Sequence, residues 1–352
     1  IASRKPDEAY RMSIGIFVCS YSYGASRHAK RSGAARRNAS TSATPGATAP
    51  RTLPLHLWYP TWNAPPGPRP NYAGLFRDPE SVTDAPPAAP VHPGGYPVVV
   101  FSHGHQGFAG NAHFLMRWMA AQGWVAIAPD HVGNTLRDTP SPLPAAIFHL
   151  RARDASAALD ALAAAPLRDA LAGPIRTDRA LLVGHSAGAH TTWAAAGATY
   201  DADAVAARCA GPNPCREGDR EAFQTGQRDR RFVAVVPMAG TISREWFGPT
   251  GHSTVAVPVL ALSGSDDPVG ADTQYESTAP LPLTWVDIRG GCHQFFGFGG
   301  CMNAPDALQG PIAGAWVLAF GRRWVLDDTS PVVEGIVSGS MSVSERVTLR
   351  RR

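Results

Sequence analysis

Short apolar runs alternate with amphipathic stretches along the chain from residue 53 onward. Residues 97–102 (Pro-Val-Val-Val-Phe-Ser) form a continuous, largely β-branched run. Such a run is typical of a strand buried on both faces of a sheet. Together with the alternating stretch 53–59, such apolar runs predict seven strands, at 53–59, 97–102, 124–128, 180–183, 232–237, 257–262 and 283–288.

Between these runs, apolar residues recur three and four positions apart, which predicts helices. The predicted helices are 112–122, 145–165, 187–196 and 312–326. Strands alternating with helices imply βαβ units and a mostly parallel sheet, with ligands bound at the carboxyl ends of the strands. The pattern therefore predicts an α/β fold with a central sheet flanked by helices.

The length allows one large domain or two small ones, and the composition is that of a globular protein. The 352 residues are 44% hydrophobic, and they include 35 glycines and 32 prolines without a repeat. That excess of turn formers predicts long loops on a packed scaffold. No stretch of about 18 uninterrupted apolar residues occurs, so a membrane-spanning helix is not expected.

The net charge of +4 divides unevenly along the chain. Residues 1–51 carry nine basic and two acidic side chains, whereas the remainder carries 23 basic and 26 acidic ones. A nucleic-acid-binding domain concentrates basic charge on its folded body. Here the body is slightly acidic, so nucleic acid is not an expected partner.

The pattern also suggests how the chain is organised. Residues 1–51 resemble a weak signal peptide followed by a disordered basic segment, because Arg11 precedes the short apolar run 14–20 and small residues follow it. Residues 52–326 form the predicted catalytic domain. The polar stretch 197–231 interrupts the alternation as an insertion or cap, and 327–352 is predicted to be a peripheral tail.

Four of the five cysteines occur as two local pairs. Cys209 and Cys215 flank a turn-forming run, and Cys292 and Cys301 flank a glycine-rich loop. Cys19 is the fifth cysteine and belongs to neither pair. Metal sites prefer closer CxxC-type spacing. Disulfides are favoured over free buried thiols, and they would place the protein outside the cytoplasm, secreted or periplasmic.

Residues 184–188 (Gly-His-Ser-Ala-Gly) contain the candidate catalytic nucleophile. They follow the predicted strand 180–183 and precede a helix of small residues, the context required for a G-x-S-x-G nucleophile elbow. The glycines leave room for a sharp turn that projects Ser186 above the sheet. The alternative is a structural glycine-rich turn. His185 is expected to point beneath the elbow in a structural role.

A serine nucleophile needs a base and an acid that orients it, in the chain order Ser, acid, His for this kind of fold. Asp266 and Asp267 follow the strand 257–262, and His293 follows the strand 283–288. The turn Gly-x-x-Asp-Pro favours Asp267 over Asp266 as the acid. His293 is the predicted base, and a surface loop histidine is the alternative.

The glycine-rich turn after the strand 97–102 predicts the oxyanion hole. Residues 101–107 (Phe-Ser-His-Gly-His-Gln-Gly) let backbone N–H groups approach a substrate oxygen. The expected donors are the amides of His105 and Ala187. His103 and His105 lack supporting ligands nearby in the sequence, so neither a metal nor another cofactor is expected.

Five motifs together resemble a known family. They are Leu57-Trp58-Tyr59-Pro60, residues 98–104, residues 128–135, Arg151-Ala152-Arg153-Asp154 and the elbow. Their order resembles the α/β-hydrolases called predicted dienelactone hydrolases, relatives of the platelet-activating-factor acetylhydrolases. The resemblance covers residues 52–326. It implies an α/β-hydrolase fold, ester hydrolysis, no cofactor and an oxyanion amide at His105.

The chain departs from both relatives. The acetylhydrolases take their acid soon after the strand that follows the elbow, and residues 237–243 here contain no carboxylate. True dienelactone hydrolases use a cysteine nucleophile, which Ser186 replaces. Neither relative's own substrate therefore follows from the resemblance.

The leading hypothesis is a serine esterase acting on short-chain or small esters, because the insertion would narrow the site. A polyester or cutin hydrolase and an inactive binding module on the same fold are the alternatives. Trp246, Phe247 and Phe295 are candidates for an aromatic pocket wall, and core packing explains them equally well.

Overall fold

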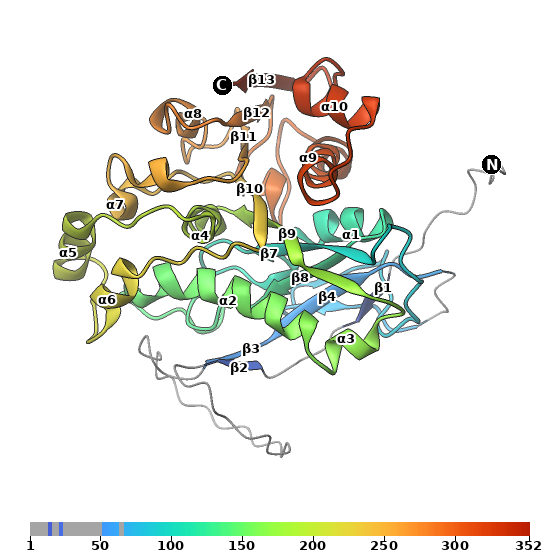
Figure 1. The fold of residues 1–352 in the computed structure, drawn as a ribbon, viewed down its shortest axis with the longest axis horizontal. Helices are drawn as coiled ribbons and strands as arrows, with labels where there is room; N and C mark the ends of the chain where they lie inside the picture. Colours follow the sequence, from blue (N-terminus) through green and yellow to red (C-terminus); the bar gives the residue numbers. More distant parts are fainter. Residues whose placement is uncertain (1–12, 16–20, 24–50, 63–66) are drawn as a thin grey trace.

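A central sheet runs through the molecule. The structure is a computed structural model that describes residues 13–15, 21–23, 51–62 and 67–352. Within these residues, nine strands pair in the spatial order β1-β4-β8-β7-β9-β10-β11-β12-β13 (Figure 1). Their bounds are β1 (Ser13–Gly15), β4 (Leu55–Tyr59), β8 (Val125–Pro129), β7 (Tyr96–Ser102), β9 (Ile175–His185), β10 (Phe232–Met238), β11 (Leu260–Gly264), β12 (Thr284–Ile288) and β13 (Val347–Arg351).

The middle of the sheet is parallel, from β8 through β12. Antiparallel strands flank it, β4 beside β8 and β13 beside β12, and β1 pairs antiparallel with β4. Two small antiparallel pairs lie apart from it: β2 (Tyr21–Tyr23) with β3 (Arg51–Leu53), and β5 (Asn71–Tyr72) with β6 (Phe76–Arg77). The predicted α/β class with a mostly parallel sheet is confirmed.

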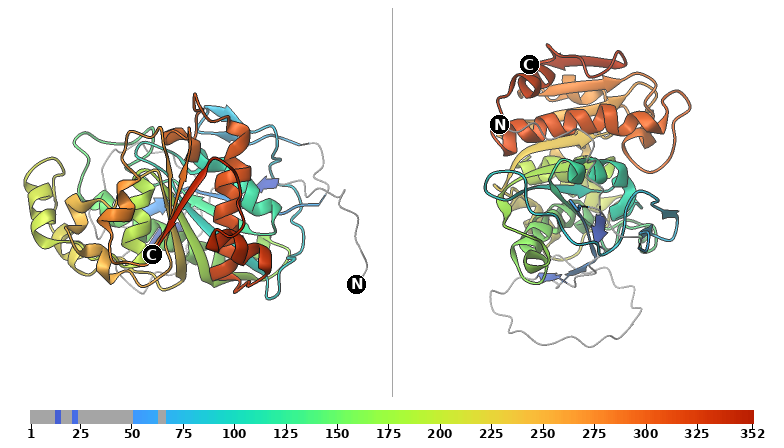
Figure 2. Two further views of the ribbon diagram at one scale, coloured as in Figure 1. Left: turned by 90° about the horizontal axis from the view of Figure 1, so that it is seen from above. Right: turned by 90° about the vertical axis from the view of Figure 1, so that its right-hand side faces the viewer.

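Helices cover both faces of the sheet (Figure 2, left). The α-helices are α1 (His113–Ala121), α2 (Ala146–Ala163), α3 (Leu167–Ala170), α4 (Ala187–Ala196), α5 (Ala202–Ala210), α6 (Asp219–Gln224), α7 (Arg244–Phe247), α8 (Thr273–Ser277), α9 (Ala315–Val325) and α10 (Pro331–Ser338). Shorter helical turns are η1 (Ala109–Ala112), η2 (Gly251–Thr254), η3 (His293–Phe296), η4 (Asp306–Leu308) and the π-helical η5 (Gln309–Gly314).

The parallel strands are buried on both faces, which explains their unbroken apolar sequence. Alternate side chains of β7 enter opposite hydrophobic cores: Val98 and Val100 pack on the side of α2 and α4, and Val99 and Phe101 pack on the side of α1 and α9. All four side chains are completely buried. The two cores fix the sheet, and the sheet in turn fixes the turns at its carboxyl edge.

The segment predicted as a peripheral tail is regular structure at the sheet edge. Residues 327–352 contain α10, which packs on α9, and β13, which pairs along the whole of β12. Pro331 in the first turn and Gly339 after the last turn delimit α10. Val347 and Leu349 alternate on β13 and pack against the core beside α9. This short alternation is too weak a pattern to identify a strand from sequence.

The predicted insertion 197–231 contains α5 and α6 and lies beside α7 (Figure 1). Part of the predicted N-terminal segment is described: residues 13–15 and 21–23 form β1 and β2. The rest of that segment, including Cys19, lies outside the described residues. Among the helices of the described part of the chain, none combines the length and apolar character needed to cross a membrane.

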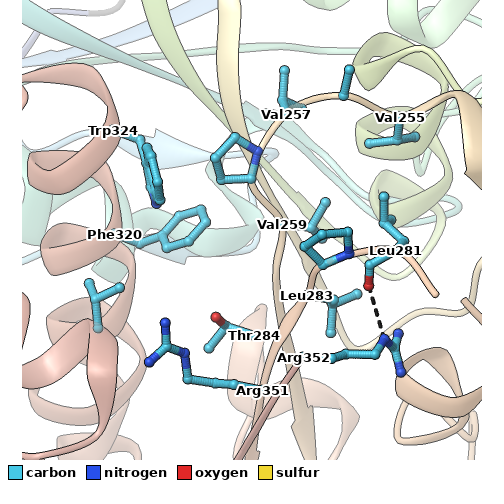
Figure 3. A pocket seen from close by; sticks show the side chains of 14 residues that line it. Val255, Val257, Val259, Leu281, Leu283, Thr284, Phe320, Trp324, Arg351 and Arg352 are labelled. Atoms are coloured by element: carbon cyan, nitrogen blue, oxygen red, sulfur yellow. Dashed lines mark hydrogen bonds between the residues drawn. The ribbon is translucent and has the colours of Figure 1, made fainter. Parts of the chain in front are cut away.

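A cleft of about 370 Å³ opens at the amino-terminal edge of β11 and β12 (Figure 3). Its wall is largely apolar and includes Val259, Leu283, Phe320 and Trp324, with Arg351 at one side. This edge is opposite to the one from which the turns after β9, β11 and β12 emerge. The cleft is therefore separate from the predicted catalytic residues.

Candidate active site

Ser186 occupies a strained turn between β9 and α4. Its backbone angles, φ 56° and ψ −116°, are rare for a residue with a side chain. A Cβ atom at Gly184 would lie 2.0 Å from the carbonyl oxygen of Gly188, and one at Gly188 would lie 2.0 Å from that of Ser102. Both positions therefore require glycine, as a nucleophile elbow does.

Turns after the neighbouring strands enclose Ser186. Its backbone N–H donates to the carbonyl of Met238 at the end of β10 over 2.9 Å. A Cβ atom at Gly104, after β7, would lie 3.2 Å from the Cβ of Ser186, and one at Gly240, after β10, would lie 2.6 Å from its carbonyl oxygen. The backbone of both neighbouring turns thus approaches the serine closely.

His293 and Asp267 form a hydrogen-bonded pair at the same edge of the sheet. His293 Nδ1 lies 3.0 Å from Oδ2 and 3.2 Å from Oδ1 of Asp267. The imidazole side chain is 23% exposed, whereas the carboxylate side chain is only 1% exposed. Burial alone would raise the pKa of Asp267, but bonds from His293 and from the Val269 N–H outweigh it and hold the pKa below its usual value. The carboxylate therefore stays ionised beside the ring.

Asp266, the alternative acid, has different surroundings. It is exposed, and its carboxylate accepts hydrogen bonds from the side chains of Ser265 and Asn303. The structure brings Asp267, and not Asp266, to His293. The sequence preference for Asp267 agrees with this placement.

His185 connects the turn at Ser186 to the His293 loop. Its Nε2 lies 2.9 Å from the carbonyl oxygen of His293, so this nitrogen donates, and Nδ1 accepts from the Asn111 side chain at 3.3 Å. The two imidazole centroids are 4.7 Å apart. Within residues 67–352, no hydrogen bond joins the Ser186 hydroxyl to His293; such bonds are often long before substrate binds.

The turn after β7 presents the His105 amide. The carbonyl oxygen of Gly104 receives the Gly107 N–H at 3.1 Å and His103 Nδ1 at 2.8 Å. His103 Nε2 accepts the N–H of His131, so Nδ1 must carry the proton. Because a trans peptide points its C=O and N–H in opposite directions, these bonds turn the His105 N–H away from the loop interior.

Beneath this turn lies a buried polar network that sequence reasoning did not assign. Arg151, on α2, is only 2% exposed. Its Nε donates to the Thr191 hydroxyl (3.2 Å), Nη1 to the Asn134 amide oxygen (2.6 Å), and Nη2 to the Ser102 hydroxyl (3.2 Å) and the His103 carbonyl. Burial lowers the pKa of Arg151 to about 9, and Asp154 opposes that shift, so the guanidinium is charged at neutral pH.

The network continues to a buried ion pair. The carboxylate of Asp154 accepts two hydrogen bonds of 3.0 Å from Arg51 and one of 2.9 Å from His131 Nδ1. His131 Nε2 then accepts the Ser102 hydroxyl at 2.9 Å. The motifs at residues 128–135 and 151–154 are thus joined in space, although periodicity gave no sign of it.

The predicted pocket aromatics lie in the interior. Trp246 and Phe247 are buried under the insertion, where Trp246 stacks on Phe148 at 4.2 Å and Phe247 stacks on His190 at 4.7 Å. Phe295 is completely buried in the other core. Core packing accounts for these positions, and a role as a substrate wall stays a prediction.

Both predicted cysteine pairs are disulfides. The Cα atoms are 4.9 Å apart in Cys209–Cys215 and 5.5 Å apart in Cys292–Cys301. The two bonds are consistent with an extracellular or other oxidising compartment. Cys292–Cys301 closes the loop that begins with His293, so it restrains the predicted base.

Loss of the Cys292–Cys301 bridge is expected to reduce turnover and thermal stability together. On the chain-entropy model, a loop of this length contributes roughly 2–3 kcal/mol. Misplacement of the imidazole is costly for catalysis. We expect Cys301→Ser to lower kcat and Tm, whereas Cys215→Ser, the matched control, affects mainly the insertion. Alkylation of Cys292 and Cys301 in the non-reduced protein, read by mass spectrometry, would contradict the premise.

Buried histidines make the fold sensitive to acid. Burial is the main cause that lowers the pKa to about 4 in His131 and His185 and to about 3 in His190. In the unfolded chain these groups titrate near pH 6.5, so between about pH 6.5 and 4 the unfolded state binds more protons. The free energy of unfolding should therefore decrease as the pH is lowered through this window, by up to about 1.4 kcal/mol per pH unit for each histidine.

Urea denaturation at pH 7.5, 6 and 5 measures this dependence. We expect His190→Gln to make the slope of unfolding free energy against pH shallower. Equal unfolding free energies at pH 7.5 and 5 would contradict the prediction.

No match to this chain was found in a scan against protein-family models or in a search of curated proteins. Among the side chains that the structure describes, no group of three or more His, Cys, Asp or Glu residues is arranged to hold a metal ion. The candidate active site accordingly consists of Ser186, His293, Asp267 and the turn that carries His105.

Proposed function

We propose that this protein is a serine carboxylic-ester hydrolase with an α/β-hydrolase fold, acting on short-chain or small esters. The observation that carries the proposal is the strained Ser186 turn between two obligatory glycines at the carboxyl end of β9. The Asp267–His293 pair after β11 and β12 supports it, in the chain order expected of this fold.

In the proposed mechanism, Ser186 Oγ attacks the ester carbonyl carbon while His293 takes its proton. Asp267 orients the imidazole and stabilises its charged form. The amides of His105 and Ala187 stabilise the oxyanion of the tetrahedral intermediate. His293 then returns the proton to the leaving alcohol, and a water molecule hydrolyses the acyl-enzyme by the same steps.

Small esters are proposed because the insertion packs on α7, which follows the turn beside Ser186, and would narrow the approach to the serine. Phe223 of α6 stacks on Trp246 of α7 at 5.2 Å, and α7 follows the turn that touches Ser186. Export to an oxidising compartment is part of the proposal, and the two disulfides support it.

The test compares p-nitrophenyl acetate with p-nitrophenyl palmitate and with a polyester film, using Ser186→Ala as the blank. Fastest turnover of the acetate supports the proposal. Preference for the palmitate or the film would replace it by a lipase-like or polyester hydrolase. If the blank hydrolyses every ester as fast as the wild type, the proposal is wrong.

A further inference from the structure

One buried side chain, that of Arg151, bonds to both segments that carry the expected oxyanion donors. Arg151 Nη2 donates to the carbonyl of His103, in the turn that carries the His105 amide. Its Nε donates to Thr191, which lies four residues after Ala187 on α4 and therefore one turn along the same face. One rigid guanidinium thus spans the two segments that supply the donors.

The remaining two bonds of Arg151 reinforce the same turn. Asn134 accepts a hydrogen bond from Arg151 Nη1. The Nδ2 atom of Asn134 in turn lies 2.8 Å from His105 Nδ1 and fixes that ring. Ser102, which receives Nη2, is the last residue of β7 and immediately precedes the turn. The guanidinium therefore contacts the strand before the turn, the turn itself and the side chain that fixes His105.

We infer that Arg151 is a positioning residue that sets the separation and orientation of the His105 and Ala187 amides for the proposed ester hydrolysis. The inference rests on the proposed function. The groups that accept hydrogen bonds from Arg151 are two side-chain hydroxyls, an amide oxygen and a backbone carbonyl, and none is a carboxylate. A planar fork can serve these diverging acceptors at once, whereas a lysine ammonium cannot reproduce its geometry.

The position of Arg151 separates this role from direct catalysis. The side chain is buried below the turn, and its donors are engaged by protein oxygens. Loss of the fork should therefore act on the transition state through the amides and leave ground-state binding of a neutral ester nearly unchanged. That difference gives a measurable split between kcat and KM.

The test uses Arg151→Lys, which keeps the charge but loses the fork, and Arg151→Met, which loses both. Arg153→Lys is the matched control, because Arg153 lies on the same helix and contacts Gln227 of the insertion at 2.9 Å. Thr191→Val removes only the hydrogen-bond acceptor on α4. It keeps the inference testable if the arginine variants do not fold. For Arg151→Lys we expect kcat to fall about 10²-fold with KM within about threefold. Thr191→Val should show a smaller fall in kcat.

Hydrogen exchange gives a readout independent of activity. In Arg151→Lys the amides of residues 103–107 and 187–191 should exchange at least about tenfold faster than in the wild type, and in Arg153→Lys at the wild-type rate. The inference is overturned if folded Arg151→Lys keeps wild-type kcat and exchange, or if Lys restores the turnover that Met loses. If the arginine variants unfold, unchanged kcat and exchange in Thr191→Val overturn it. A wild-type protein without esterase activity contradicts the proposed function, and the exchange result still decides the role of Arg151.

Discussion

Replacement of Ser186 with alanine is expected to abolish ester hydrolysis, with turnover falling on the order of 10⁶-fold. The side chain supplies the only protein atom proposed to form a covalent bond with the acyl group of the substrate. The fold should persist, because alanine fits wherever serine fits and the flanking glycines keep the turn open. Turnover of p-nitrophenyl acetate and Tm measure the two effects.

Ser243→Ala provides the matched control for this variant. Like Ser186, Ser243 is a serine with positive φ, 54°, near the carboxyl edge of the sheet, but its side chain is buried whereas Ser186 is partly exposed. It should retain wild-type turnover, which separates loss of the nucleophile from a change in backbone strain. An Ser186→Ala protein with more than about 1% of wild-type turnover would show that another residue is the nucleophile.

Asp267→Asn is expected to reduce turnover roughly 10⁴-fold. Asparagine preserves the shape of the side chain, but its NH₂ group can face His293 Nδ1 and stabilise the wrong tautomer of the ring. The loss should appear mainly in kcat, because Asp267 lies behind the imidazole with its side chain 1% exposed.

Asp266→Asn is the neighbouring control and should change turnover little. Its carboxylate is exposed and bonded to Ser265 and Asn303, not to His293. Both variants are assayed at the same pH and ester concentration. The opposite ranking would transfer the role of the acid to Asp266.

The sequence was sufficient to predict the mostly parallel sheet and the strand–turn–helix around Ser186. Buried strands such as β7 and β10 are recognisable because both of their faces meet a core. The predicted helix 187–196 has the bounds of α4. The strained turn at Ser186 was predictable because strand, glycines and helix are contiguous, so no long-range contact is needed to identify it.

Contacts between distant segments were not predictable. The bonds of Arg151 join residues 17 to 49 positions apart, and no period or spacing in the sequence encodes them. Asn111, which holds His185, lies 74 residues from it. The aromatic side chains of α7 were ambiguous for the same reason, since residue type alone does not distinguish a pocket wall from a core.

The strand β13 has a practical consequence for anyone shortening the chain. A domain boundary at residue 326, suggested by sequence, would remove α10 and β13 and leave β12 as a bare edge. β12 is largely apolar, and such an edge invites strand pairing between molecules. In the intact chain the outer strand carries Arg350 and Arg351, whose charges discourage that pairing. Material trimmed at 326 should therefore aggregate during expression, and a lost yield from it would say nothing about catalysis.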